Sequence, residues 1–84
     1  IPPLTGERRQ QLVKVVKKYT EDCKIAIRNV RRDFNEKLKA KEKKHEISED
    51  DGRKGLEKLQ KITDGCIKEA EKLSETKEKD ILNV

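Results

Sequence analysis

One side of the first half of this chain carries basic side chains at helical spacing. At about 100° per residue they lie roughly opposite an apolar stripe, interrupted by Glu21 and Glu42. A solvated helix usually mixes its charges as i,i+4 pairs, so this segregation calls for a partner. Arginine binds phosphate through a planar fork of N–H donors, and the pattern therefore favours a polyanion. This basic side consists of Lys14, Lys17, Lys24, Arg28, Arg31, Arg32 and Lys39.

The composition of the basic side narrows the kind of polyanion. No aromatic residue lies among the basic side chains, so stacking on nucleic-acid bases is not expected. The pattern instead indicates contact with the backbone and shape of structured RNA. An acidic protein surface is an alternative partner. An anionic membrane fits less well, because an interfacial helix exposes large apolar residues to lipid, whereas a packed bundle would hide them here.

Length and composition exclude several classes of protein. The 84 residues are 46% charged and 31% hydrophobic, which is too little apolar material for an enzyme with a buried pocket. No acid–base pair with a pocket, nucleophile with a base, or phosphate-binding loop is present, so we expect no enzyme. His45 is the only histidine, and Cys23 and Cys66 lack metal-ligand spacing, so neither a metal nor a cofactor is expected. No apolar run approaches the ~20 residues of a membrane span.

A long helix must position the basic side. Apolar residues recur at steps of three and four, which is the spacing of a helix rather than a strand. Thr5 is the expected N-cap, and neither proline nor glycine interrupts residues 7–44. We expect an extended start at Pro2 and Pro3, followed by a helix over about 5–44. The apolar stripe is Leu12, Val16, Tyr19, Cys23, Ala26, Val30, Phe34 and Leu38.

A second helix follows a short turn at about 45–47. Ser48 opens a capping box in its aspartate variant, with three acids in the first turn, and predicts a helix over about 48–82. Gly52, Gly55 and Gly65 each cost this helix about 1 kcal/mol relative to alanine, unless they allow a close approach of the helices. The second apolar stripe is Leu56, Leu59, Ile62 or Thr63, Cys66, Ala70 and Leu73.

The predicted fold is all-α, an antiparallel hairpin of two long helices. A connection of about three residues makes the helices antiparallel neighbours. Two stripes do not enclose a core, so we expect a third helix, either from a missing segment or from a second chain. Tyr19, Phe34, Cys23 and Cys66 lie on the stripes and are expected to pack in that core. The chain begins at Ile1 rather than at methionine, and we expect a fragment.

Four runs of sequence resemble the bacterial ribosome recycling factor family. They are IPPLTGERR (residues 1–9), IRNVRRD (27–33), KHEISEDD (44–51) and KEKDILNV (77–84). Gly6 departs from the acid that is common in the family's first turn. The resemblance implies that residues 1–84 are the second and third helices of a three-helix bundle, without the first helix and an inserted β domain.

The resemblance also implies a function. The family is cytoplasmic and not enzymatic; it acts with elongation factor G to split ribosomes after termination, and its helical domain lies along large-subunit ribosomal RNA. Without the first helix, we expect the chain to self-associate through its apolar stripe. The alternative function is a helical oligomerisation module whose basic side binds an acidic protein. Taking the resemblance and the basic side together, the predicted RNA-binding residues are Arg9, Arg28, Arg31, Arg32, Lys24 and Lys17.

Overall fold

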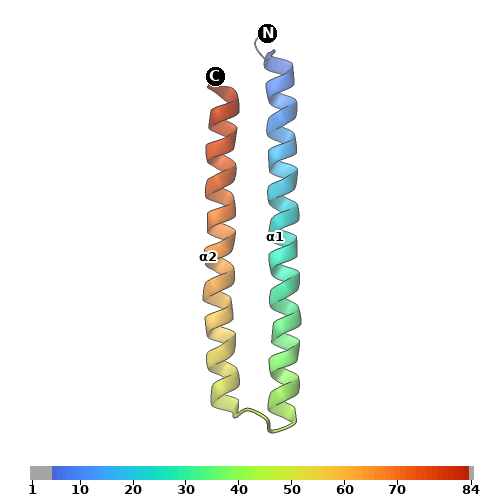
Figure 1. The fold of residues 1–84 in the computed structure, drawn as a ribbon, viewed down its shortest axis with the longest axis vertical. Helices are drawn as coiled ribbons and strands as arrows, with labels where there is room; N and C mark the ends of the chain where they lie inside the picture. The colour runs from blue at the N-terminus through green and yellow to red at the C-terminus, as the bar shows by residue number, and fades with distance from the viewer. Residues whose placement is uncertain (1–4, 84) are drawn as a thin grey trace.

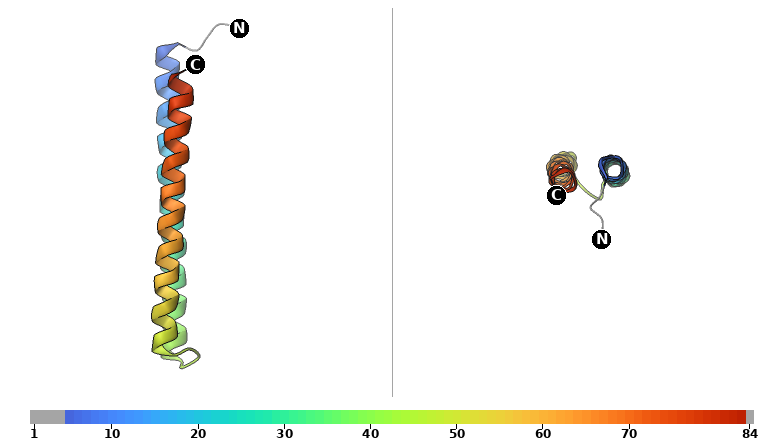
Figure 2. Two further views of the ribbon diagram at one scale, coloured as in Figure 1. Left: turned by 90° about the vertical axis from the view of Figure 1, so that its left-hand side faces the viewer. Right: turned by 90° about the horizontal axis from the view of Figure 1, so that it is seen from above.

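Two long antiparallel helices make up the fold. A computed structural model describes residues 5–83, so the extended start expected at Pro2 and Pro3 lies outside the described residues. Helix α1 spans Gly6–Lys43 and helix α2 spans Glu49–Leu82. The helices lie side by side over their whole length, and the start of α1 and the end of α2 lie at the same end of the rod (Figures 1 and 2). The rod measures 64 by 15 by 15 Å, and the predicted all-α hairpin is confirmed.

Side-chain caps begin both helices at the predicted residues. The Thr5 hydroxyl oxygen accepts a hydrogen bond from the Arg8 N–H at 3.1 Å. The Ser48 hydroxyl oxygen accepts one from the Asp51 N–H at 3.0 Å. Each bond satisfies an N–H that has no partner inside the helix. The acids in the first turn of α2 also face the positive end of the helix dipole.

Helix α1 ends in a Schellman motif whose left-handed residue is His45. The His45 N–H donates to the Glu42 carbonyl at 3.1 Å, and the Glu46 N–H donates to the Lys41 carbonyl at 3.0 Å. These are the two bonds that define the motif. His45 has a φ of 59°, in the region that glycine usually occupies at this position. The chain therefore reverses between the helices at the cost of some backbone strain at one residue.

The line of contact between the helices, called the seam below, contains small and hydroxyl-bearing residues. Thr63 is 4% exposed, and its hydroxyl donates to the Leu59 carbonyl at 2.7 Å. The Thr20 hydroxyl donates in the same way to the Val16 carbonyl at 2.8 Å. These bonds to the preceding turn satisfy the two hydroxyls, so the threonines can be buried against the other helix without an unsatisfied hydrogen-bonding group.

Two of the α2 glycines allow the helices to approach closely. A Cβ added at Gly52 would lie 2.7 Å from the Glu42 Oε2, and one added at Gly55 would lie 3.3 Å from the Leu38 Cδ1. A Cβ at Gly65 would meet nothing within 4 Å. The close-approach interpretation of these glycines is therefore confirmed near the turn and wrong at Gly65.

The apolar stripes do not form a core in this hairpin. Among residues 5–83 no hydrophobic side chain is fully buried, as two stripes alone predict. Tyr19 is 68% exposed and Phe34 50% exposed in this hairpin. The core expected for them needs a third helix, so their packing in it stays a prediction. Cys23 and Cys66 are exposed free thiols rather than buried ones.

The apolar stripe of α1 remains exposed because of the position of the seam on this helix. The half-buried residues of α1 recur through Val16, Thr20 and Ile27, along one edge of the apolar stripe, so the middle of the stripe faces solvent. The resulting exposed surface is called the apolar side. It comprises Tyr19, Cys23, Val30 and Phe34 of α1 and Ile62, Cys66 and Leu73 of α2.

Candidate nucleic-acid interface

The seam separates two different surfaces of the hairpin. Thr20 and Ser74 line shallow grooves on both sides of it. One groove is completed by Leu73 and other members of the apolar side. The other is completed by Lys24 and Glu71, together with neighbouring charged residues. The basic side of α1 and the apolar side therefore lie on opposite sides of the seam, and the basic side meets charged residues of α2.

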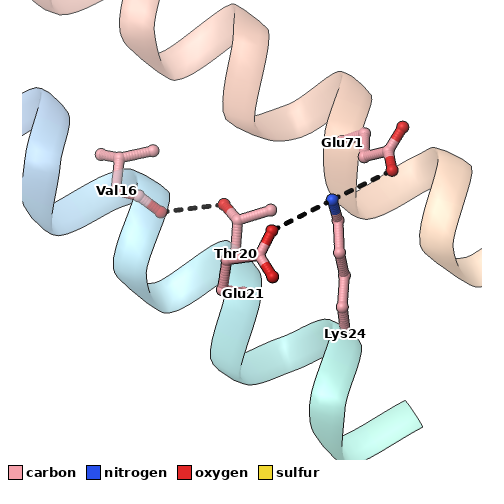
Figure 3. A network of polar contacts seen from close by, with 5 residues as sticks. All are labelled: Val16, Thr20, Glu21, Lys24 and Glu71. Atoms are coloured by element: carbon pink, nitrogen blue, oxygen red, sulfur yellow. Dashed lines mark hydrogen bonds and ion pairs between the residues drawn. The ribbon is translucent and has the colours of Figure 1, made fainter. Parts of the chain in front are cut away.

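Lys24 is held between two carboxylates. Its Nζ lies 3.0 Å from the Glu71 Oε1 of α2 and 3.4 Å from the Glu21 Oε1 of its own helix (Figure 3). The side chain is only 16% exposed. The hydrogen bond with Glu71 raises the pKa of Lys24 above its ordinary value, despite the opposing effect of burial. Lys24 is therefore a charged side chain whose field is largely compensated inside the hairpin.

Arg31 and Lys17 also face α2. The Arg31 Nη1 donates to the Gln60 Oε1 at 3.3 Å, so its partner is a neutral amide. The Lys17 Nζ lies 3.9 Å from the Glu78 Oε1, and the Lys17 side chain remains 66% exposed. At that distance and exposure the ion pair is weak and leaves Lys17 able to turn toward solvent.

Arg28 and Arg32 form no hydrogen bond or ion pair with the described residues of α2. They are four residues apart, so both lie on the same outer part of the helix one turn apart. Both are exposed, and Arg32 donates from Nη2 to the Asn29 Oδ1 at 3.2 Å within the helix. Arg28 makes no hydrogen bond or ion pair with any residue in the range 5–83. Two neighbouring guanidinium groups without a carboxylate partner are suited to binding phosphate oxygens.

Arg9 lies apart from the other predicted residues, at the open end of the rod. Its Nη1 donates to the Leu82 carbonyl oxygen at 3.3 Å. A cation is favourable there, because the last carbonyls of α2 carry the negative end of the helix dipole. The rise of a helix puts Arg9 about 28 Å from Arg28 along α1. The six predicted residues thus form one central group and one distant residue.

Sequence reasoning missed the α2 residues that face the basic side. Glu71 and Glu78 are seven residues apart, so they share one face of α2, and they meet Lys24 and Lys17 respectively. The available signal was charge, because residues 1–44 carry a net +8 and residues 45–84 a net −3. Combined with the register of an antiparallel hairpin, that signal places acids of α2 beside bases of α1.

No group of three or more histidine, cysteine, aspartate or glutamate side chains in residues 5–83 is arranged to hold a metal ion. Neither of the two helices, as described, combines the length and apolar character needed to cross a membrane.

The fold and its two surfaces define a helical binding module, with a basic side and an apolar side on one antiparallel hairpin. The sequence model of the family "Ribosome recycling factor" matches residues 1–82. The chain belongs to the ribosome recycling factor family.

Curated relatives are similar in sequence to the chain over all of its 84 residues. The ribosome-recycling factor of Oleidesulfovibrio alaskensis is 54% identical over all 84 residues, which cover 46% of that protein. The corresponding proteins of Staphylococcus saprophyticus and Carboxydothermus hydrogenoformans are 56% and 51% identical over all 84 residues, covering 46% and 45% of their lengths. The chain therefore spans about half the length of the curated relatives it matches.

Proposed function

We propose that this chain is the RNA-facing hairpin of a ribosome recycling factor, and that the whole protein acts after translation termination. Membership of the family and the names of the relatives support this role. The segregated basic side supplies a surface for a polyanion. The proposed action is binding rather than catalysis. In the whole protein it takes place in the cytoplasm with elongation factor G, whose GTP hydrolysis drives the separation of the subunits.

The proposed partner of the hairpin is large-subunit ribosomal RNA. The observation that carries this proposal is the exposed pair Arg28 and Arg32, one turn apart and without a carboxylate partner in residues 5–83. Arg31 adds a third guanidinium, because its partner Gln60 does not cancel its charge. Each arginine that neutralises a phosphate releases condensed counterions, so binding weakens as salt rises.

The remaining predicted residues have smaller or separate roles in this proposal. Lys24 and Lys17 lie beside Glu71 and Glu78, so they contribute less charge to the RNA than their positions suggest. Arg9 makes a separate contact at the open end of the rod.

A binding experiment with isolated large ribosomal subunits tests the proposal. The wild-type chain is expected to bind, with an affinity that falls steeply across a salt titration. The Arg28→Gln/Arg32→Gln variant is expected to lose most of that affinity at unchanged helicity. Lys61→Gln/Lys68→Gln is the matched control, because it removes two charges from the face of α2 turned away from the seam. Absence of binding by the wild-type chain would overturn the proposal.

The apolar side supports a second proposal, that the isolated chain self-associates. Tyr19, Phe34 and Leu73 are each at least half exposed on the apolar side, and exposed apolar patches mark interaction sites. Leu73→Lys is expected to reduce association in sedimentation experiments without loss of helix. A well-folded, strictly monomeric wild-type chain at tens of micromolar would contradict this proposal.

Helicity that depends on concentration, without affinity for RNA, would instead favour the oligomerisation module that binds an acidic protein.

A further inference from the structure

Two basic residues of α1 meet α2 through different chemistry. Lys24 meets the carboxylate of Glu71, which is charged and opposes its own charge. Arg31 meets Gln60, whose side-chain amide is neutral. An amide can hold a guanidinium in place by a hydrogen bond without compensating its positive charge. At the seam, the positive charge of Lys24 is therefore compensated by a carboxylate, whereas Arg31 is only held in orientation.

The amide of Gln60 is itself oriented by Asp64. The Gln60 Nε2 donates to the Asp64 Oδ1 at 2.9 Å, one turn further along α2. An ionised carboxylate only accepts hydrogen bonds, so it can pair with the NH2 group of the amide and not with its oxygen. This interaction turns the Gln60 Oε1 toward Arg31, where it accepts from Nη1 at 3.3 Å. Asp64, Gln60 and Arg31 thus form a short chain of hydrogen bonds across the seam.

Arg31 keeps most of its capacity to bind in this arrangement. A guanidinium has five N–H donors, and within residues 5–83 only the Nη1 group of Arg31 has an acceptor. Arg31 is half-buried, so neighbouring side chains restrict its movement as well. A side chain that is already held loses less conformational entropy when it binds. The arrangement presents a pre-oriented guanidinium three residues from Arg28.

We propose that Gln60 is a positioning residue for RNA binding, and that Asp64 sets the orientation of its amide. This inference rests on the proposed function, in which Arg31 contacts ribosomal RNA. Gln60 acts through Arg31 and need not touch the RNA itself. Asp64 then favours RNA binding although its own charge repels RNA.

The test measures affinity for isolated large ribosomal subunits at one fixed salt concentration. Gln60→Ala leaves the net charge unchanged and is expected to weaken binding about three- to tenfold, at wild-type helicity. In an Arg31→Gln background the same change is expected to have no further effect. A merely structural role of Gln60 would instead give the same loss in both backgrounds.

Replacing Asp64 distinguishes a positioning role from long-range electrostatics, because the two predict opposite changes in the affinity for RNA. Asp64→Ala removes a negative charge, so long-range electrostatics alone predicts tighter binding of RNA. The inference predicts weaker binding. It also predicts recovery in Asp64→Asn, whose side-chain oxygen can still accept from Gln60. Glu57→Ala is the matched control, because it removes an exposed acid from the same face of α2 two turns earlier and is expected to leave affinity unchanged or raised.

The outcomes separate the inference from the function on which it rests. Weaker binding in Gln60→Ala that disappears in the Arg31→Gln background, with weaker binding in Asp64→Ala, supports the inference. If the wild-type chain binds and Gln60→Ala binds equally well, the inference is overturned and the proposed function stands. If the wild-type chain does not bind large subunits, the proposed function fails and the inference fails with it.

Discussion

The Lys24 Nζ of α1 lies 3.0 Å from the Glu71 Oε1 of α2, in the middle of the hairpin (Figure 3). This pair joins the basic side of one helix to the acidic face of the other. One turn further along α1, Arg28 has no such partner within the described chain. The basic side is therefore divided into residues compensated by α2 and residues that remain available to an external anion.

Replacing Glu71 by glutamine should make Lys24 available to RNA. Glu71→Gln keeps a hydrogen-bond acceptor beside Lys24 but removes the compensating charge. We expect tighter binding to large ribosomal subunits and a salt slope steeper by up to about 0.9, the contribution of one phosphate contact. Glu75→Gln is the control, because Glu75 lines the same groove and forms no ion pair with Lys24. Weaker binding in Glu71→Gln would show that the pair supports binding through structure instead.

The raised pKa of Lys24 predicts how the pair depends on pH. A group whose folded-state pKa is raised contributes stability that is fully present below its unfolded pKa and is lost as pH rises through the folded value. The difference in unfolding free energy between the wild-type chain and Lys24→Met should therefore be constant near neutral pH. It should shrink in alkaline solution above the ordinary lysine pKa, as followed by thermal unfolding. A difference in unfolding free energy that grows with pH would contradict a raised pKa for Lys24.

The glycines of α2 should respond differently to alanine. Gly65→Ala should raise stability by about 1 kcal/mol, because an added Cβ meets nothing within 4 Å and alanine favours the helix. Gly55→Ala should gain less, because Leu38 must move, and Gly52→Ala should also gain less, because the Glu42 carboxylate must rotate away. Denaturant midpoints of the three variants give the order. A larger gain at Gly55 than at Gly65 would contradict the close approach of the helices.

His45→Gly should stabilise the hairpin. A left-handed backbone costs an L-residue about 1–2 kcal/mol, and glycine adopts it without that strain. After the greater chain entropy of glycine is counted, we expect a gain of about 1 kcal/mol in unfolding free energy. Lys44→Gly is the control, because φ is −82° at Lys44 and no strain is relieved there. Equal effects of the two substitutions would exclude strain at His45.

Helix positions were predictable from local patterns, because caps and apolar spacing act over a few residues. Thr5 and Ser48 carry cap signals that need no knowledge of the rest of the fold, and both caps form. The short connection between the stripes was likewise enough to predict an antiparallel hairpin. These features depend on chemistry within one or two turns of a helix.

The seam was not predictable from the same patterns. The spacing of the apolar stripe of α1 does not decide which of its two edges meets α2. In the structure Thr20 and Thr63 occupy the seam with their hydroxyls bonded to the preceding turn, while Tyr19 remains exposed. The pairing of Lys24 with Glu71 follows from that choice of edge.

We propose that Arg28 and Arg32 bind phosphate on the large ribosomal subunit. The most direct measurement is the salt dependence of binding for the wild-type chain, Arg28→Gln/Arg32→Gln and Lys61→Gln/Lys68→Gln. Each lost phosphate contact lowers the steepness of log affinity against log salt by about 0.7–0.9, so the arginine variant should be less steep by about 1.5. The lysine variant should retain the wild-type slope. Equal slopes for all three proteins would contradict the claim.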